Sequence, residues 1–206
     1  MSSHPHAIIG LVLAAGLGSR YAQTSGGCKL THPLPPHGQP VVQRSTSALT
    51  SACDATYVVT GHWQTEVMQA LCADPKLKAQ LLHCPDYALG MGQSIKTAIA
   101  QTHPTLGWLV SLGDMPYIQP HTSQKMAQAL QQGALLARPL YQGRPGHPVA
   151  FSHQLRTALL AIDDANGASS VLKTWAADLL CIEVDDPGCV RDLDTVQDLL
   201  PSIMIG

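Results

Sequence analysis

The sequence has little charge and no excess of either sign. Asp, Glu, Lys and Arg together make up 13% of its 206 residues, and the formal net charge is −2 at pH 7. Proteins that bind nucleic acid or an anionic membrane through their electrostatic field usually carry a basic patch or a strongly basic balance. We therefore expect neither nucleic acid nor a membrane as a partner.

Long apolar runs and a secretory leader are also lacking. No run approaches the roughly 18 residues that a membrane-spanning helix needs, and residues 1–6 lack the pattern of a signal peptide. Hydrophobic residues still make up 45% of the chain, which suits a globular core and argues against disorder. We therefore expect a soluble cytoplasmic protein.

None of the six cysteines stands in a C-x-x-C pair, so a zinc site has little support. A chain of this size does not need a disulfide framework either. We interpret the cysteines as small buried hydrophobic residues, and we set Cys28 apart because it lies in a loop with a functional pattern. The ten histidines are scattered through loops and do not predict a metal cluster.

Short apolar runs alternate with helical patterns along the chain, beginning with the continuous run Ala7–Ala14, which is typical of a strand buried on both faces. Further strands are expected at Ala55–Thr60, Gln80–Cys84, Trp108–Leu112, Ala134–Ala137, Val149–Phe151 and Leu179–Val184. Helices are expected at Val41–Ala52, Trp63–Cys72, Ser94–Gln101, Ser123–Gln132, Gln154–Ile162, Ser169–Ala177 and Thr195–Leu200.

This alternation predicts a single α/β domain over residues 1–206. Its sheet should be Rossmann-like and mostly parallel, with helices on both faces. In such sheets ligands bind beyond the carboxyl ends of the strands. A motif that directly follows a strand is therefore a candidate functional site.

The loop after the first strand is rich in glycine and carries two cations. Gly16 and Gly18 permit a close approach of the backbone to a bound group, and successive N–H groups in such a loop can hold phosphate oxygens. Arg20 adds a planar cation suited to a polyphosphate, and Lys29 could reach the α- or β-phosphate of a nucleotide. A tight turn without a ligand, with a solvated lysine, is the alternative.

Two familiar phosphate-binding patterns do not fit this loop. A dinucleotide-binding turn needs a third small residue where Tyr21 stands, and an acidic residue about 20 positions further on is missing. No G-K-[ST] follows the glycines, which excludes a P-loop. A nicotinamide dehydrogenase is therefore disfavoured.

Two acidic residues are candidate ligands of Mg²⁺. Asp114 follows a buried strand, and Gly113 clears space beside it. Asp192 follows the last strand, where Asp194 can cap the next helix and leaves Asp192 free for a metal. Magnesium takes one or two carboxylates together with phosphate oxygens. The alternatives are that Asp114 only caps its turn and that Asp192 is a surface acid.

These pieces resemble, in order along nearly the whole chain, the MobA-like NTP transferases, and within that family the molybdenum cofactor cytidylyltransferases. The matching segments are LAAGLGSRY (13–21), KL (29–30), PLPPHGQPV (33–41), GMGQSI (90–95), GDMP (113–116), GRPGHPVAF (143–151) and RDLDTVQDL (191–199). The resemblance implies a fold like that of the nucleotide-diphospho-sugar transferases, a bound NTP and Mg²⁺.

The resemblance also implies roles for individual residues. Catalysis would fall to Arg20, Lys29 and Asp114, and the metal to Asp114 and Asp192. The acceptor would lie near Gly146 and His147, although a hydrogen-bonded loop histidine is the alternative for His147. Nucleotide contacts would come from Leu13, Ala14, Ala15, Gly16, Gly18, Ser19, Arg20, Lys29, Gly92, Ser94 and Gly113.

Guanylyltransferases of this family usually have a glycine where Ala15 stands, so the resemblance favours CTP over GTP. It implies transfer of CMP to a molybdopterin-type cofactor, with release of pyrophosphate and delivery to a molybdenum enzyme. An arginine that the family often has after Gly167-Ala168 is absent here, which puts the acceptor in question. A guanylyltransferase and an enzyme acting on a sugar or polyol phosphate are the enzymatic alternatives. A cofactor-binding chaperone is the non-enzymatic one.

Overall fold

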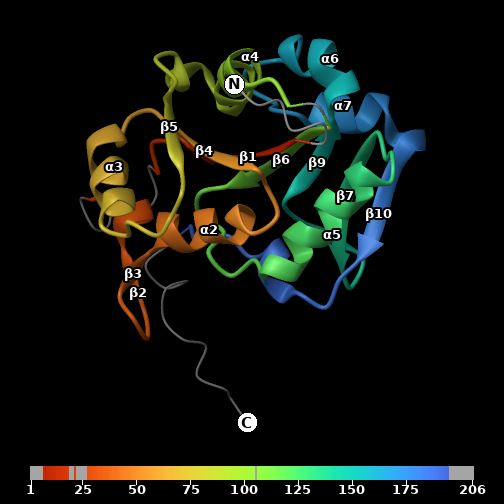
Figure 1. Cartoon of the computed structure of the whole chain (residues 1–206). Helices are drawn as coiled ribbons and strands as arrows, with labels where there is room; N and C mark the ends of the chain where they lie inside the picture. The colour runs from red at the N-terminus through yellow and green to blue at the C-terminus, as the bar shows by residue number, and fades with distance from the viewer. Residues whose placement is uncertain (1–6, 19–20, 22–26, 105, 195–206) are drawn as a thin grey trace.

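The computed structural model describes residues 7–18, 21, 27–104 and 106–194 (Figure 1). Its main sheet has eight strands, in the order β10-β7-β9-β6-β1-β4-β5 with β8 paired to β7. Their bounds are β1 Ile8–Ala14, β4 Ala55–Thr60, β5 Gln80–His83, β6 Gly107–Leu112, β7 Leu136–Tyr141, β8 Arg144–Pro145, β9 Val149–Ser152 and β10 Leu179–Glu183. Except for the two-residue β8, each lies on or overlaps a strand expected from the sequence.

The sheet is mostly parallel, as the sequence predicted. Strand β1 lies between β6 and β4 and is parallel to both, while β5 extends the parallel order at one edge and β10 is parallel to β7 at the other. Strand β9 is the exception, because it runs antiparallel to both β6 and β7. Its apolar run did not reveal its direction.

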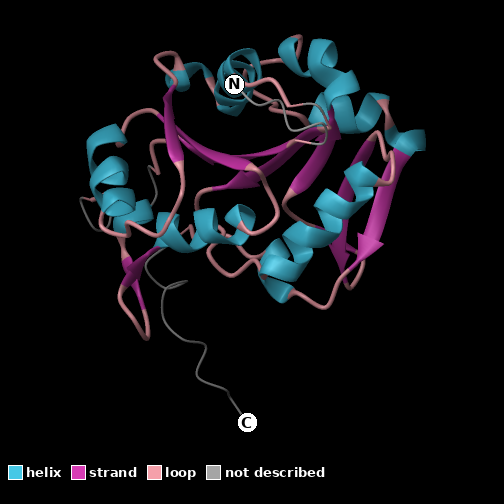
Figure 2. Cartoon of the chain, viewed as in Figure 1, coloured by secondary structure: helices cyan, strands magenta, loops and turns pink. Residues whose placement is uncertain are grey.

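Helices cover both faces of the sheet (Figure 2). One face carries α2, α3 and α5, and the other carries α4, α6 and α7 (Figure 1). Their bounds are α2 Val41–Thr50, α3 Gln64–Cys72, α4 Met91–Gln101, α5 Pro120–Gln131, α6 Arg156–Leu160 and α7 Ser169–Thr174. The helix expected at Thr195–Leu200 lies outside the described residues. None of the helices in the described ranges is long and apolar enough to cross a membrane.

Short 3-10 helices join several of these elements. They are η1 Lys29–Thr31, η2 Tyr87–Leu89, η3 His153–Leu155, η4 Ala176–Asp178 and η5 Pro187–Val190. A small hairpin, β2 (Pro33–Leu34) with β3 (Gln39–Pro40), fills the proline-rich segment where no regular element was expected. Prolines obscure the alternation of apolar and polar residues by which a strand is recognised.

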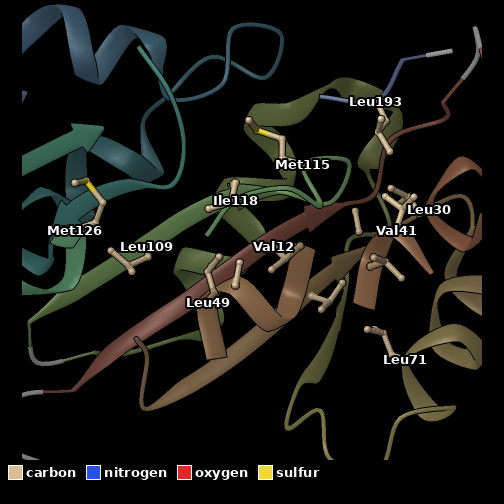
Figure 3. Close-up of a cluster of buried hydrophobic side chains, with 14 of the residues drawn as sticks. Val12, Leu30, Val41, Leu49, Leu71, Leu109, Met115, Ile118, Met126 and Leu193 are labelled. Carbon is tan, nitrogen blue, oxygen red and sulfur yellow. The ribbon is translucent and has the colours of Figure 1, made fainter. Parts of the chain in front are cut away.

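The side chains of β1 point alternately to the two faces of the sheet, and the core accordingly has two layers. Successive side chains of a strand point to opposite faces, so Ile8 and Val12 join the cluster under α2, α3 and α5, while Ile9 and Leu11 join the cluster under α4, α6 and α7. Figure 3 shows the first cluster, in which Val12 lies near Leu49 of α2. Burying a large aliphatic side chain contributes about 1.5–3 kcal/mol, so this double burial fixes β1 at the centre of the sheet.

The cysteines divide by burial rather than forming one class. Cys84 and Cys189 are buried, as expected, and Cys28, which was set apart, is buried too. Cys72 and Cys181 are exposed and Cys53 is half-buried, contrary to the expectation. Among the residues that the structure describes, no group of three or more His, Cys, Asp or Glu side chains could hold a metal.

Candidate active site

A cavity of about 380 Å³ opens at the carboxyl ends of β1 and β6. This is the edge where a parallel sheet presents its ligand site. Five segments far apart in the sequence form its wall. They are the end of β1 with its loop, the start of η1, the loop after β4, the stretch from η2 to the entry of α4, and the end of β6. The lining residues are Leu13, Ala14, Ala15, Gly16, Leu17, Gly18, Cys28, Lys29, Leu30, Trp63, Tyr87, Ala88, Gly90, Met91, Ser94, Leu112 and Asp114.

The glycine loop presents bare backbone to this cavity. Gly18 has a φ of +58°, which L side chains rarely adopt. A Cβ added to Gly16 or Gly18 would meet nothing within 4 Å, so both positions face open space. The arrangement allows a phosphate group to reach the backbone of the loop. Ser19 and Arg20, which the sequence assigned to the nucleotide, lie outside the described residues.

Lys29 and Asp114 meet across the cavity wall, although 85 positions separate them in the sequence. The Lys29 Nζ lies 2.8 Å from Asp114 Oδ2 and donates to the Leu193 carbonyl at 2.6 Å. It also lies 3.5 Å from Asp194 Oδ1. One ammonium group thus joins three segments: the start of η1, the end of β6 and the segment after η5.

The second oxygen of Asp114 is in a different environment. Asp114 Oδ1 is buried and has no hydrogen-bond partner in the described part of the chain. A buried carboxylate oxygen without a partner is costly. It is a suitable ligand for a divalent cation, because hard cations prefer carboxylate oxygens. Asp114 therefore fits a metal on one oxygen while Lys29 holds the other.

The C-terminal segment is anchored beside Asp114 by its backbone. The Leu193 N–H donates to the Asp114 carbonyl at 2.9 Å. Asp192 is exposed. Burial lowers the pKa of His147, and the nearby charges of Asp114 and Asp192 oppose this shift only in part. The sequence interpretation missed Asp194 as a partner of Lys29, because Asp194 was assigned to cap the following helix.

Gly113 brings the ends of β1 and β6 together rather than lining the cavity. Its N–H donates to the Leu13 carbonyl at 2.8 Å, and its carbonyl accepts from Ser45 Oγ at 2.9 Å. A Cβ at this position would lie 3.0 Å from the Leu13 carbonyl oxygen. A side chain here would be in tight contact with the backbone of β1, so Gly113 favours the close approach of the two strand ends beside Asp114.

At the entry to α4, Gly90, Met91 and Ser94 line the cavity but Gly92 does not. The Gly92 N–H donates to the Asp164 carbonyl at 2.8 Å, and a Cβ there would lie only 2.2 Å from the Asp163 carbonyl oxygen. Gly92 therefore holds the helix entry against the segment before α7. The nearby Gly90 and Ser94 are the groups that the structure presents to the cavity.

Two aromatic residues of the cavity wall were not identified from the sequence. Trp63 packs against the first hydrophobic cluster and also lines the cavity, and its Nε1 donates to the Leu17 carbonyl at 3.0 Å. Tyr87 lines it as well, with its hydroxyl 3.3 Å from His62 Nδ1. Trp63 lies three residues after β4, so the rule that selected Asp114 could also have selected Trp63.

A second cavity of about 180 Å³ adjoins the first. Leu13, Met91 and Leu112 line both cavities. The other lining residues are Ile95, Val110, Arg138, His147, Val149, Phe151, Asn166, Ala168, Ser169 and Leu172. The two cavities could therefore hold two reactants side by side.

His147, which the resemblance assigned to the acceptor, lines the second cavity, whereas Gly146 lines neither cavity. The Gly146 N–H donates to the Pro139 carbonyl, and a Cβ there would lie 2.5 Å from the Cys189 carbonyl oxygen. Gly146 thus allows the chain to pass close to η5. Burial lowers the pKa of His147, which keeps its imidazole neutral near pH 7.

A mostly parallel sheet with a glycine-built loop, a lysine and a partly buried carboxylate at its carboxyl edge defines a nucleotide-binding transferase of the α/β class. The chain belongs to the family of MobA-like NTP transferase domains, whose pattern matches residues 10–179. It is accordingly a nucleotidyltransferase.

Similar proteins support this assignment. The chain is 27% identical over 190 residues to the molybdenum cofactor cytidylyltransferase of Escherichia coli strain K12, covering 92% of each chain. Its fold is similar to that of a nucleotidyl transferase from Methanothermobacter thermautotroptrophicus, with a TM-score of 0.78 and 23% identity over 93% of this chain and 94% of that one. It is also similar to Rv0371c of Mycobacterium tuberculosis H37Rv in complex with manganese, with a TM-score of 0.72, 24% identity and coverage of 93% and 95%.

Proposed function

We propose that this enzyme transfers CMP from CTP to a molybdopterin-type cofactor and releases pyrophosphate. The observation that carries the proposal is the pair of adjoining cavities, with Lys29 and Asp114 in the wall of the larger one. The larger cavity has a glycine loop for a triphosphate. The smaller is mostly apolar, which suits a planar ring. The similarity to a molybdenum cofactor cytidylyltransferase supports this choice of substrates.

We propose Mg²⁺ as the metal, held by Asp114 and Asp192. The fit rests on Asp114 Oδ1, which is buried and lacks a partner among the described residues. When bound, such an ion neutralises phosphate oxygens and orients the phosphates for in-line displacement. The position of Asp192 after the last strand, next to the segment hydrogen-bonded to Asp114, supports its assignment as the second ligand.

The protein groups act on charge and position. The acceptor phosphate is already an anion, so its attack on the α-phosphorus needs no protein nucleophile. Lys29 lies at the cavity wall, where its ammonium group can stabilise the charge that develops on the α-phosphate. Arg20 is proposed to neutralise the leaving pyrophosphate. The Cys28 thiol is no substitute nucleophile, because burial raises its pKa and keeps it protonated.

For the base we propose contacts from Trp63, Tyr87 and the entry to α4. The two aromatic rings offer faces or edges to a pyrimidine, and the backbone and hydroxyl groups from Gly90 to Ser94 offer hydrogen bonds to its polar edge. His147, neutral in the second cavity, is proposed to hydrogen-bond the acceptor.

A two-stage experiment tests the proposal. Thermal shifts with CTP, GTP, ATP and UTP in the presence of Mg²⁺ should be largest for CTP. Pyrophosphate release should then require molybdopterin, with the product identified by mass spectrometry. Preference for GTP, or turnover with a sugar or polyol phosphate but not with molybdopterin, would contradict the proposal. Tight cofactor binding without pyrophosphate release from any NTP would instead favour a chaperone that serves a molybdenum enzyme.

A further inference from the structure

The second cavity contains a cation that the rest of the described chain leaves unpaired. Arg138 lies on β7 and lines this cavity. Its Nε is buried and has no hydrogen-bond partner in the described residues, and none of their carboxylates forms an ion pair with it. Burial lowers the pKa of the guanidinium group, but an arginine remains charged at any physiological pH.

The walls of this cavity offer nothing to neutralise that charge. None of the described lining residues is acidic, and the wall beside Arg138 includes the apolar side chains of Val149 and Phe151. Arg138 as a whole is half-buried, and a partly desolvated charge without a partner is unfavourable. An anion from outside the chain is therefore suited to complete this cavity.

Other polar groups of the cavity cannot take the place of this cation. Asn166 and Ser169, on the opposite segment, offer an amide and a hydroxyl. His147 Nδ1 is buried without a partner, and the low pKa of His147, to which the positive charge of Arg138 contributes, keeps the ring neutral. Among the described lining residues Arg138 is the one full positive charge. Its fork of N–H groups matches a carboxylate or a phosphate.

We propose that Arg138 binds the anionic group of the acceptor and selects a planar heteroaromatic ring that carries such a group. This inference rests on the proposed function for the identity of the acceptor. The ring lies against Phe151 and Val149, the anion meets Arg138, and His147 and Asn166 bind the polar ring edge. The acceptor is thus held by a charge on β7.

Two probes that share one ring test the role of Arg138 without turnover. Pterin-6-carboxylate carries an anionic substituent, and 6-hydroxymethylpterin carries a neutral one. Their binding to the full chain is measured by the fluorescence of the pterin ring. We expect the wild-type protein to bind the carboxylate about 10-fold more tightly or better, as a charge-assisted bidentate contact would provide. Arg138→Gln should abolish this preference, and Arg138→Lys should keep part of it.

Arg144→Gln is the matched control. Arg144 is an exposed cation on β8, in the same hairpin as Arg138, and it lines neither cavity. The Arg144→Gln variant should bind the carboxylate with the same preference as the wild-type protein. Thermal unfolding should show that each variant is folded. If Arg138→Gln does not fold, Arg138→Lys decides: a reduced preference supports the inference and an unchanged one overturns it.

The outcomes separate this inference from the proposed function. A wild-type protein that binds neither probe, or binds both equally, overturns the role of Arg138. So does an Arg138→Gln variant that retains the preference. If the preference depends on Arg138 but no CMP is transferred to molybdopterin, the inference stands and the proposed function fails. If the wild-type protein transfers CMP to molybdopterin but shows no preference between the probes, the proposed function stands and the inference fails.

Discussion

At the scale of single residues, Asp114 has two carboxylate oxygens in unlike environments. Lys29 holds Oδ2 at 2.8 Å, while Oδ1 is buried without a partner in the described chain. An asparagine keeps the shape of the side chain but removes the charge that both a cation and Lys29 require.

We therefore expect Asp114→Asn to lower kcat by about 10²- to 10³-fold, the usual cost of removing one electrostatic contact from a reaction centre. Pyrophosphate release measures the effect, and thermal unfolding should show that the fold is retained. Asp178→Asn, which changes an exposed carboxylate in η4, is the control and should have wild-type activity. An Asp114→Asn variant with more than about a tenth of the wild-type rate would contradict the role of this carboxylate.

Trp63 should report nucleotide binding through its fluorescence. It lines the larger cavity, whereas Trp108 is buried at 1% exposure and Trp175 packs on the other hydrophobic cluster. A nucleotide beside the Trp63 ring should change its emission. We expect CTP to alter the tryptophan fluorescence of the wild-type protein and of Trp175→Phe but not of Trp63→Phe. A signal that survives in Trp63→Phe would place the nucleotide elsewhere.

The sequence predicted some members of this site better than others. Lys29 and Asp114 stood out because charges are rare in this chain. Lys29 follows a glycine-rich loop, and Asp114 follows a buried strand. Arg138 was missed because it lies within an apolar strand, where a cation has no local signature. The packing roles of Gly92 and Gly113 depend on carbonyl groups from distant segments, which no local pattern contains.

At the scale of elements, Asp186 fastens the loop after β10 to the start of α5. Its Oδ2 accepts from the Gln119 N–H at 2.9 Å and from Thr122 Oγ1 at 2.7 Å, and its Oδ1 accepts from the Gly188 N–H at 2.9 Å. The side chain is only 1% exposed. Three donors therefore depend on one buried carboxylate.

We expect Asp186→Ala to lower the free energy of unfolding by about 3 kcal/mol, because it leaves these donors unsatisfied in the interior. Urea unfolding measures the loss. The adjacent Asp185 is exposed, so Asp185→Ala should change stability by no more than about 0.5 kcal/mol. Equal losses in the two variants would show that the contacts of Asp186 do not stabilise the fold.

Most elements and the mostly parallel character of the sheet could be predicted from the sequence, whereas the direction of β9 could not. The continuous run at β1 and the runs at β4 and β6 marked buried strands, since a parallel strand needs apolar side chains on both faces. The direction of β9 depends on its partners β6 and β7. Three of its four residues, Val149 to Phe151, are apolar and read the same in either direction, so its antiparallel pairing was not predictable.

At the scale of the whole molecule, the burial of His147 couples stability to pH. Burial lowers its pKa in the folded protein below the ordinary value of 6.5. Between those two pKa values the unfolded chain binds more protons than the folded one, so acid favours unfolding. The stabilising effect of the neutral imidazole is complete above pH 6.5 and is lost as the pH falls toward the folded pKa.

We expect the wild-type protein to lose more stability than His147→Gln when the pH is lowered from about 7.5 to about 5, because the variant lacks this titrating group. Urea unfolding across that range measures both curves. The other histidines titrate in both proteins and cancel in the comparison. Curves that remain parallel would contradict the assignment of a neutral, buried His147.

The reversed direction of β9 changes how the two cavities are formed at one edge of the sheet. The chain leaves β1 and β6 at this rim and enters β9 there, so His147 precedes its strand whereas Asp114 follows its own. In the proposed arrangement, the nucleotide is therefore bound by loops that follow strands, and the acceptor partly by a segment that precedes a strand. The segment from β8 to the start of β9 can therefore change without moving the loops that follow β1 and β6. It could be exchanged between homologues while the proposed triphosphate site keeps its geometry.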